Sequence, residues 1–248
     1  MSNIQNSFNF NNGNTFGTSS ETAVKTFMTQ VFAWMSGALM ITALTSYLFG
    51  HISSLMSVLY RIDGDAIIGM TPIGWAVVFA PLALVMVMSF AFNKLSFPAL
   101  VGVFMLYSAV NGMSLSTIFL RYEMSLIGVA FAITAGMFGV MAVMGFVTKA
   151  DLSKFGSILF MGLIGIVIAS LVNMFVGSST LDYIISFVGV AVFTGLTAYD
   201  VQTLKNIAAG NEYGEATMSK LAVMGALRLY LDFINLFLMI LRLLGRRD

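Results

Sequence analysis

An all-α membrane protein of seven helices is the fold class that this sequence predicts, from three observations. Charged residues make up only 9% of the chain and hydrophobic residues 58%, whereas a soluble domain carries about 25% charged residues. Seven apolar stretches have the length of about 20 residues that a helix needs to cross a hydrocarbon core about 30 Å thick. These stretches are continuously apolar and do not alternate with polar residues, which argues against a transmembrane β-barrel.

The chain begins with a polar segment, and the seven predicted spans follow it. Residues 1–24 are rich in Asn and Ser and lack the basic start and short apolar core of a cleaved signal peptide. We therefore predict a disordered tail over 1–24 and a seven-helix transmembrane domain over 25–248. The predicted spans are Phe27–Phe49, Ile73–Phe92, Pro98–Leu120, Ser125–Val147, Ser157–Val176, Tyr183–Leu204 and Leu221–Leu244.

The connections between the spans are too short to hold a soluble catalytic domain. The longest are 50–72 and 205–220, and neither contains a phosphate-binding glycine loop. The absence of cysteine excludes disulfides and thiolate metal sites, and a net charge of +1 provides no basic face for nucleic acid. The single histidine, His51, is remote from the acids that a catalytic triad would need. We expect no enzyme activity and no resident cofactor.

Basic residues in the short loops predict that the N-terminus is cytoplasmic. One side of the membrane collects six lysines and the other collects Arg61 and Arg121, and basic residues favour the cytoplasmic side. Seven full spans would place Arg246 and Arg247 outside, so a re-entrant seventh segment stays open as an alternative. The compact chain and its Asn-rich tail favour a multi-pass protein of the bacterial inner membrane.

Two aspartates inside the predicted spans form the candidate functional site. A carboxylate in hydrocarbon is costly and therefore marks function by default. Asp200 lies about 7 Å along the helix from Lys205, and Asp232 lies one turn after Arg228. Because a short connection makes the last two spans antiparallel neighbours, we expect the carboxyl groups of Asp200 and Asp232 to face each other.

Such a pair has a specific chemistry. Two carboxylates close together in a poorly solvated site cannot both ionise cheaply, and they tend to share a proton. Losing this proton would separate the acids and leave an oxygen-rich anionic site that suits Ca²⁺. Asp200 and Asp232 are therefore the predicted pH sensor, ion gate and Ca²⁺ ligands. Asn235 is a candidate supporting ligand, and Lys94 and Arg228 are candidate counter-cations.

Structural explanations of the same residues remain open. Asp200 would pair with Lys205 if it lay at the membrane surface, and Asp232 would pair with Arg228 along one helix. Asn235 is equally suited to a hydrogen bond between helices. A polar stripe in the third span is best explained by helix–helix hydrogen bonding, with pore lining as the alternative; it consists of Ser108, Asn111, Ser114, Ser116 and Thr117.

Three segments resemble the Bax inhibitor-1 family, also called the transmembrane Bax-inhibitor-motif family. They are LRLYLDFINLFLMILRLLG at 227–245, LTAYDVQTLKN at 196–206 and YSAVNGMSLSTIF at 107–119. The resemblance covers residues 27–245 and implies seven helices, the last surrounded by the other six. It also implies a pH-sensitive Ca²⁺ leak controlled by Asp200 and Asp232. Lys94 stands where a bacterial member has a pairing arginine, and Arg228 stands where a small or neutral residue is expected.

Three functions follow as hypotheses. The leading one is a passive, pH-sensitive Ca²⁺ leak. The second, also implied by the resemblance, is a non-conducting regulator of stress responses or of a membrane protease, which acts through contacts with other membrane proteins. The third is a proton-coupled secondary transporter that uses Asp200, although the inverted repeat that would support it is not evident. The expected partners are the lipid bilayer, Ca²⁺ and protons.

Overall fold

The computed structural model describes residues 15–63, 66–210 and 213–245. In chain order its elements are α1 (Thr15–His51), α2 (Ser53–Leu59), β1 (Tyr60–Asp63), β2 (Ala66–Met70), α3 (Pro72–Phe90), α4 (Phe97–Leu115), α5 (Ile118–Arg121), α6 (Met124–Val147), α7 (Ser153–Val176), α8 (Ser179–Ala209) and α9 (Glu215–Leu244). Within these residues, seven helical segments are long and apolar enough to cross a membrane, with α5 continuing α4. The predicted all-α, seven-span fold class is confirmed.

Local signals in the sequence set several helix ends. The side chains of Thr71 and Ser96 each accept a hydrogen bond from a backbone N–H three residues later, and a proline follows in the first turn of α3 and of α4. Helix α7 ends at Gly177, whose φ of 65° lies in the left-handed region that glycine adopts readily. Ser178 then caps α8.

Two local structures differ from the prediction. Helix α1 begins at Thr15, inside the segment predicted to be disordered, and an ion pair of 2.7 Å joins Glu21 to Lys25 one turn later. The polar start of a helix that projects from the membrane carries no apolar run, so hydropathy alone misses it. Residues 1–14 lie outside the described residues, and their predicted disorder stays a prediction. The link after α1 contains the antiparallel hairpin of β1 and β2.

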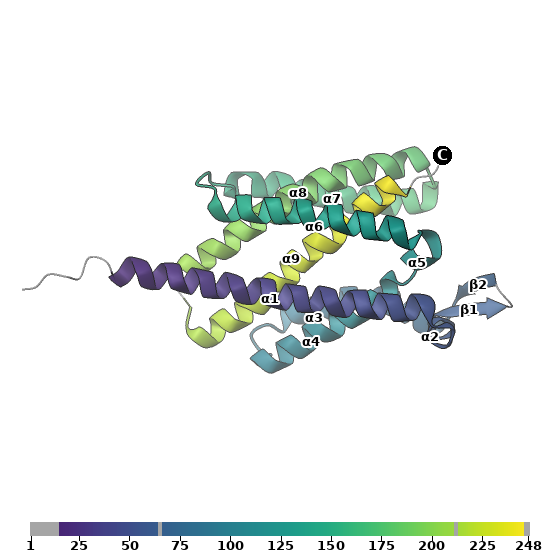
Figure 1. Ribbon diagram of the computed structural model, residues 1–248, viewed down its shortest axis with the longest axis horizontal. Coiled ribbons are helices and arrows are strands. Elements are labelled where there is room, and N and C mark those ends of the chain that lie inside the picture. Colours follow the sequence, from purple (N-terminus) through teal and green to yellow (C-terminus); the bar gives the residue numbers. More distant parts are fainter. Residues whose placement is uncertain (1–14, 64–65, 211–212, 246–248) are drawn as a thin grey trace, which may run out of the picture.

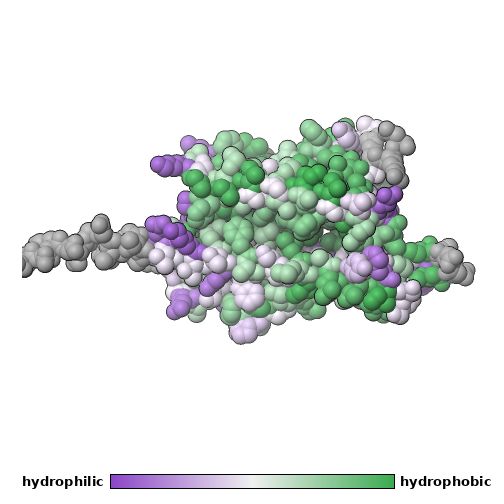
Figure 2. Space-filling view, in the orientation of Figure 1, coloured by the Kyte–Doolittle hydropathy of each residue, from purple (hydrophilic) through white to green (hydrophobic). Residues whose placement is uncertain are grey.

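The helices form two layers with α9 crossing between them (Figure 1). Helices α6, α7 and α8 lie on one side, and α1, α3 and α4 lie on the other. We call the end at which α1 begins the tail end and the end that carries β1 and β2 the hairpin end. Apolar surface covers the middle of the bundle, and hydrophilic residues gather at these two ends (Figure 2), as expected for a bundle that spans a membrane.

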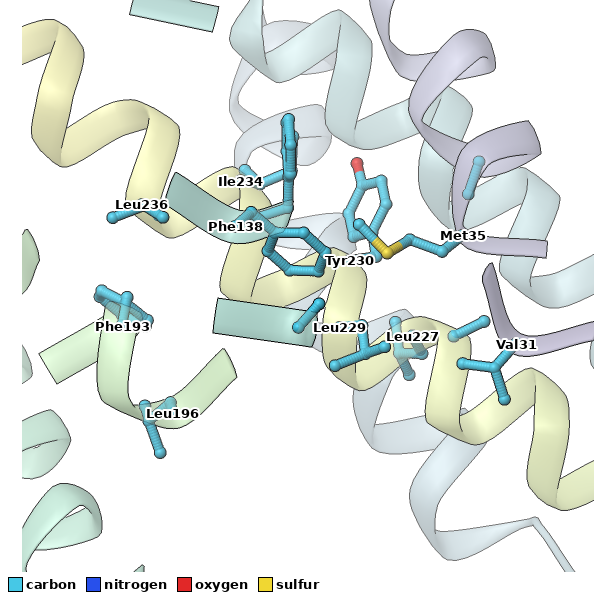
Figure 3. Packing of buried hydrophobic residues seen from close by; sticks show 14 of the residues in the cluster. Val31, Met35, Phe138, Phe193, Leu196, Leu227, Leu229, Tyr230, Ile234 and Leu236 are labelled. Atoms are coloured by element: carbon cyan, nitrogen blue, oxygen red, sulfur yellow. The ribbon is translucent and has the colours of Figure 1, made fainter. Parts of the chain in front are cut away.

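Helix α9 is the most buried of the seven spans. In its most apolar stretch, 67% of the residues are buried, and it packs against α1, α4, α6 and α8. It runs from the tail end to the hairpin end, so it is a full-length span and not a re-entrant segment (Figure 1). Tyr230 lies on the side of Val31 and Met35, whereas Leu236 lies on the side of Phe193 (Figure 3). Enclosure of α9 by all six other helices stays a prediction.

Candidate functional site

The structure brings Asp200 of α8 and Asp232 of α9 together. Both residues are buried, with 6% and 5% of their surface exposed, both line one cavity, and their carboxyl groups are close enough to interact electrostatically. A carboxylate can only accept, so a hydrogen bond between two carboxyl groups requires that one of them carries a proton. Placed side by side, the two acids have the arrangement that sharing one proton requires.

Arg228 supplies the positive charge beside this pair. Its Nη1 atom lies 3.5 Å from Oδ1 of Asp200, so the ion pair joins α9 to α8. The expected pairing of Arg228 with Asp232 along one helix is not what the structure shows. Lys205 does not take this place either, because its Nζ atom donates to the backbone carbonyl of Phe146 at 2.7 Å.

Lys94 lies apart from the aspartates. It is exposed in the turn that follows α3, and it makes no ion pair with another described residue. Helix α3 belongs to the layer opposite α8 and packs against α4. Of the two candidate counter-cations, the structure therefore brings Arg228 to the pair and leaves Lys94 at the surface.

One oxygen of the pair has no partner, and a cavity lies beside it. Oδ2 of Asp232 is buried and accepts no hydrogen bond from the described residues. A cavity of about 570 Å³ between α7, α8 and α9 is lined by Asp200, Arg228, Asp232 and Asn235, together with Tyr199 and Ser157. We call it the aspartate cavity. It gathers the predicted site residues except Lys94 into one space.

The donors in the aspartate cavity bear on the predicted Ca²⁺ site. Asn235 donates its amide N–H to the carbonyl of Leu231 at 2.8 Å, within its own helix, so it forms no bond to a neighbouring helix through this group. Among the described residues, no group of three or more His, Cys, Asp or Glu side chains is arranged to hold a metal. Ca²⁺ takes six to eight oxygen ligands. The two carboxyl groups and Asn235 are too few to complete that shell without water.

In the polar stripe of the third span, the Asn111 side chain forms a hydrogen bond to another helix, as the favoured explanation predicts, whereas the hydroxyls of Ser108 and Thr117 donate to carbonyls of their own segment. Asn111 donates to the hydroxyl of Tyr230 at 2.8 Å, and this hydroxyl lies 2.7 Å from Oγ1 of Thr42. Thr42 in turn donates to the carbonyl of Ser108 at 2.9 Å. The carbonyl of Ala38, at 3.0 Å, is a second acceptor for the one hydroxyl proton of Thr42, and since that proton goes to a carbonyl, Tyr230 donates to Thr42. We call this chain from Asn111 through Tyr230 and Thr42 to Ser108 the tyrosine network.

Neither Tyr230 nor Gln202 was predicted from the sequence as a site residue, although they lie in the segments 227–245 and 196–206. A tyrosine in the middle of a buried helix needs a partner for its hydroxyl, and Tyr230 is fully buried. Gln202, two residues after Asp200, accepts the N–H of Leu152 and donates to the carbonyl of Ala150, both at 2.8 Å. This side chain therefore fixes the α6–α7 link (148–152) against α8.

Comparisons with known proteins show which family the chain matches and which proteins it is similar to. A family model described as "Inhibitor of apoptosis-promoting Bax1" matches residues 24–248. The chain is 44% identical over 225 residues to the inner membrane protein YbhL of Escherichia coli, covering 90% of this chain and 93% of that protein. It is 42% identical to an uncharacterized protein of Borreliella burgdorferi, covering 89% and 92%. It is 35% identical to an uncharacterized membrane protein of Streptococcus pyogenes, covering 93% and 97%.

Proposed function

The chain belongs to the Bax inhibitor-1 family of membrane proteins, and on this premise we propose that it is a passive, pH-sensitive cation leak that passes Ca²⁺. Its gate is the pair Asp200 and Asp232. The observation that carries the proposal is the contact between these two buried carboxyl groups beside a cavity, with Oδ2 of Asp232 unpartnered. We place the protein in a bacterial inner membrane, as the name of its Escherichia coli relative indicates for that protein.

The closed state depends on a shared proton. While one carboxyl group keeps its proton, the pair carries a single negative charge, which Arg228 balances from 3.5 Å. When the proton leaves, two like charges lie in contact and repel each other in a medium that screens poorly. Separation of α8 from α9 then relieves this repulsion, and the pair is the contact that held them together at this depth.

Ca²⁺ acts in this scheme as cargo and not as a resident ligand. Asp200, Asp232 and Asn235 offer oxygen ligands, and water in the aspartate cavity completes the shell of an ion in passage. The guanidinium of Arg228 opposes a cation, so the ion enters only when Arg228 turns away from the cavity. Half of the Arg228 side chain is already exposed, at 52%, which leaves it room to turn.

Ca²⁺ flux into liposomes that hold a Ca²⁺-sensitive dye tests the gate. Flux is measured between about pH 6 and about pH 8, and in the wild-type protein it is expected to rise severalfold with pH, because loss of the shared proton opens the gate. Asp232→Asn has no second carboxylate, so its flux is expected to vary by less than about twofold over the same interval.

Asp182→Asn is the matched control, since Asp182 also lies on α8 but pairs with Arg242 at 3.8 Å, away from the aspartate cavity. It should keep the wild-type pH dependence. The same pH profile in wild type and Asp232→Asn would reject the gate. No flux in any variant, together with a stoichiometric partner in pull-downs from native membranes, would support the non-conducting regulator instead.

A further inference from the structure

A second cavity lies toward the hairpin end and shares no lining residue with the aspartate cavity. Its volume is about 390 Å³, which falls in the range of about 300–1,000 Å³ for ligand pockets. Its walls come from α1, α4, α5, α6 and α9, and they are almost wholly apolar. Rings contribute much of the lining, from Phe119, Phe131, Phe233 and Phe237. We call this space the phenylalanine cavity.

The phenylalanine cavity continues into the surface that faces lipid. Helix α1 packs against α4, α5, α8 and α9, whereas α6 packs against α8 and α9, so the space between α1 and α6 has α9 as its floor. Tyr47 and Phe131 line the cavity from its two sides and are 45% and 48% exposed. Figure 2 views this side, where apolar surface of α1 and α6 borders a recess.

One polar group inside the phenylalanine cavity lacks a partner. Ser46 lines the cavity, is only 4% exposed, and has a hydroxyl with no hydrogen bond to any described residue. Buried polar groups are almost always paired, so an orphaned one calls for a ligand. Ser46 lies roughly 8 Å along the helix from His51, which ends α1 at the hairpin end. With His51 taken as the headgroup level at this end, Ser46 falls at the edge of the hydrocarbon core, within reach of a lipid ester group.

We propose that the phenylalanine cavity binds one acyl chain of a membrane phospholipid from the leaflet at the hairpin end. The chain enters between α1 and α6, its ester carbonyl accepts the hydroxyl hydrogen of Ser46, and its methylene groups contact Phe233 and Phe237 of α9. The cavity runs along α1 from Tyr47 to Leu39, about 12 Å toward the middle of the membrane, which is the direction of an acyl chain.

A phospholipid is the occupant that fits best, because the cavity opens between α1 and α6 on the apolar flank of the bundle. The walls exclude a charged ligand, and the single orphaned hydroxyl suits one ester oxygen. The site is therefore independent of the aspartate gate, and its test does not depend on ion flux.

Gly128 provides the variant that closes the cavity. It lies on α6 and lines the cavity, and a Cβ atom added there would meet no atom within 4 Å. A side chain at this position therefore starts in open space at the edge of the cavity, and a phenylalanine is the substitution that we expect to obstruct the opening. Gly139 lies on the same helix with equally open surroundings, but it does not line the cavity. Gly139→Phe is therefore the matched control for Gly128→Phe.

The experiment uses the full-length protein in vesicles that contain a phospholipid with a photoreactive group at the end of one acyl chain. After illumination, mass spectrometry maps the labelled peptides. Phe233 and Phe237 are 4% and 6% exposed, so general contact with lipid does not label them. We expect label on the α9 peptide that contains them in the wild type and in Gly139→Phe, and a fall of about tenfold in Gly128→Phe.

Ser46→Ala tests the polar contact separately. It should reduce the amount of phospholipid that remains bound during purification by severalfold while the label still reaches α9. Label confined to outward-facing residues such as those of α7, with the α9 peptide unlabelled in the wild type, would overturn the proposal. So would equal labelling of α9 in Gly128→Phe and in Gly139→Phe. Phospholipid retention that is unchanged in Ser46→Ala would overturn the ester contact.

Discussion

Tyr230 and Asp232 leave α9 on opposite faces, because two residues correspond to about 200° around an α-helix. Toward α1 and α4, the hydroxyl of Tyr230 receives a hydrogen bond from Asn111 and donates one to Thr42. Toward α7 and α8, Asp232 contacts Asp200 but leaves Oδ2 without a partner among the described residues. The hydroxyl on one face of this turn of α9 has its hydrogen-bond partners, whereas one carboxyl oxygen on the other face has none among the described residues.

This difference indicates which side of α9 stabilises the fold and which side can respond to a proton or an ion. A complete buried network makes each member depend on the others and fixes one arrangement of helices. An incomplete one stores free energy that a proton, an ion or a movement can release, and such exceptions are typical of functional sites. The tyrosine network thus fixes α9 on one side, and the unpartnered oxygen leaves α9 able to respond on the side of the aspartate cavity.

One helix on the aspartate side, α7, is packed less tightly than α1 and α4 on the other side. In the most apolar stretch of α7, which forms a wall of the aspartate cavity, only 6% of the residues are buried, against 28% in α1 and 33% in α4 with α5. The contacts of α7 are chiefly with α8. Displacing α7 therefore breaks fewer contacts than displacing α1 or α4, whereas α8 is firmly packed, with 56% of its most apolar stretch buried, so α7 is the wall of the aspartate cavity that is easiest to displace.

Among the substitutions that test this comparison of the two faces of α9, Tyr230→Phe is expected to have the largest effect. Removing the hydroxyl leaves Asn111 and Thr42 each short of a partner, which should lower the free energy of unfolding by about 1–2 kcal/mol. The pH dependence of Ca²⁺ flux should stay that of the wild type, because the pair on the other face is untouched. Unfolding in mixed detergent and liposome flux measure the two quantities.

Tyr107→Phe is the control for this change. The ring of Tyr107 lies 5.5 Å from that of Tyr230 and is equally buried, but its hydroxyl makes no hydrogen bond with the described residues that define the tyrosine network. It should cost less stability than Tyr230→Phe. A wild-type stability for Tyr230→Phe, or a changed pH profile, would show that the two faces are not separate in function.

A smaller effect is expected from Arg228→Gln, which removes the charge that balances Asp200. Because the arginine is half exposed and the distance is 3.5 Å, stability should change by only about 0–1 kcal/mol. Ca²⁺ flux near neutral pH should rise by about two- to fivefold, since a positive charge no longer opposes the ion at the cavity.

Lys94→Gln removes the other candidate counter-cation and should leave both stability and flux at wild-type values. If Lys94→Gln raised the flux as much as Arg228→Gln, the balancing charge would come from the opposite layer of the bundle. The aspartate side would then depend on α3, and the contrast between the two faces of α9 would fail.

Length and hydropathy alone were sufficient to predict the seven spans, because the bilayer imposes both. The same measures missed the start of α1 at Thr15 and the β1–β2 hairpin, where polar residues and local pairing decide the structure. The approach of Asp200 to Asp232 followed from a short connection and the helical repeat.

Which cation reaches Asp200 could not be predicted in the same way. It depends on how α8 and α9 are rotated about their axes, and packing sets that rotation. Tyr230 and Gln202 were missed because an uncharged polar side chain hardly lowers the hydropathy of a span. Their partners lie more than 40 residues away in the chain, so the pairing is visible only in the fold.

The smallest expected effect concerns Asp151, in the α6–α7 link that leads into the wall of the aspartate cavity. Its Oδ1 atom accepts the N–H of Ser153 at 3.0 Å, and the hydrogen bonds to Ser153 hold the pKa of Asp151 below its ordinary value of 3.8. Asp151→Ala should therefore speed hydrogen exchange of the Ser153 amide severalfold at neutral pH. The difference from wild type should vanish as the pH falls through this lowered pKa, because the lowered value means that only the ionised form gives the extra stability.

Asp151→Asn keeps an acceptor oxygen without the charge, so it should protect the same amide by an amount that no longer depends on pH. Ca²⁺ flux should be that of the wild type in both variants, since Gln202 still holds the α6–α7 link through Ala150 and Leu152. A large change in flux would mean that Gln202 alone does not fix this wall. The aspartate cavity would then be opened as readily by its surface link as by the proton that Asp200 and Asp232 share.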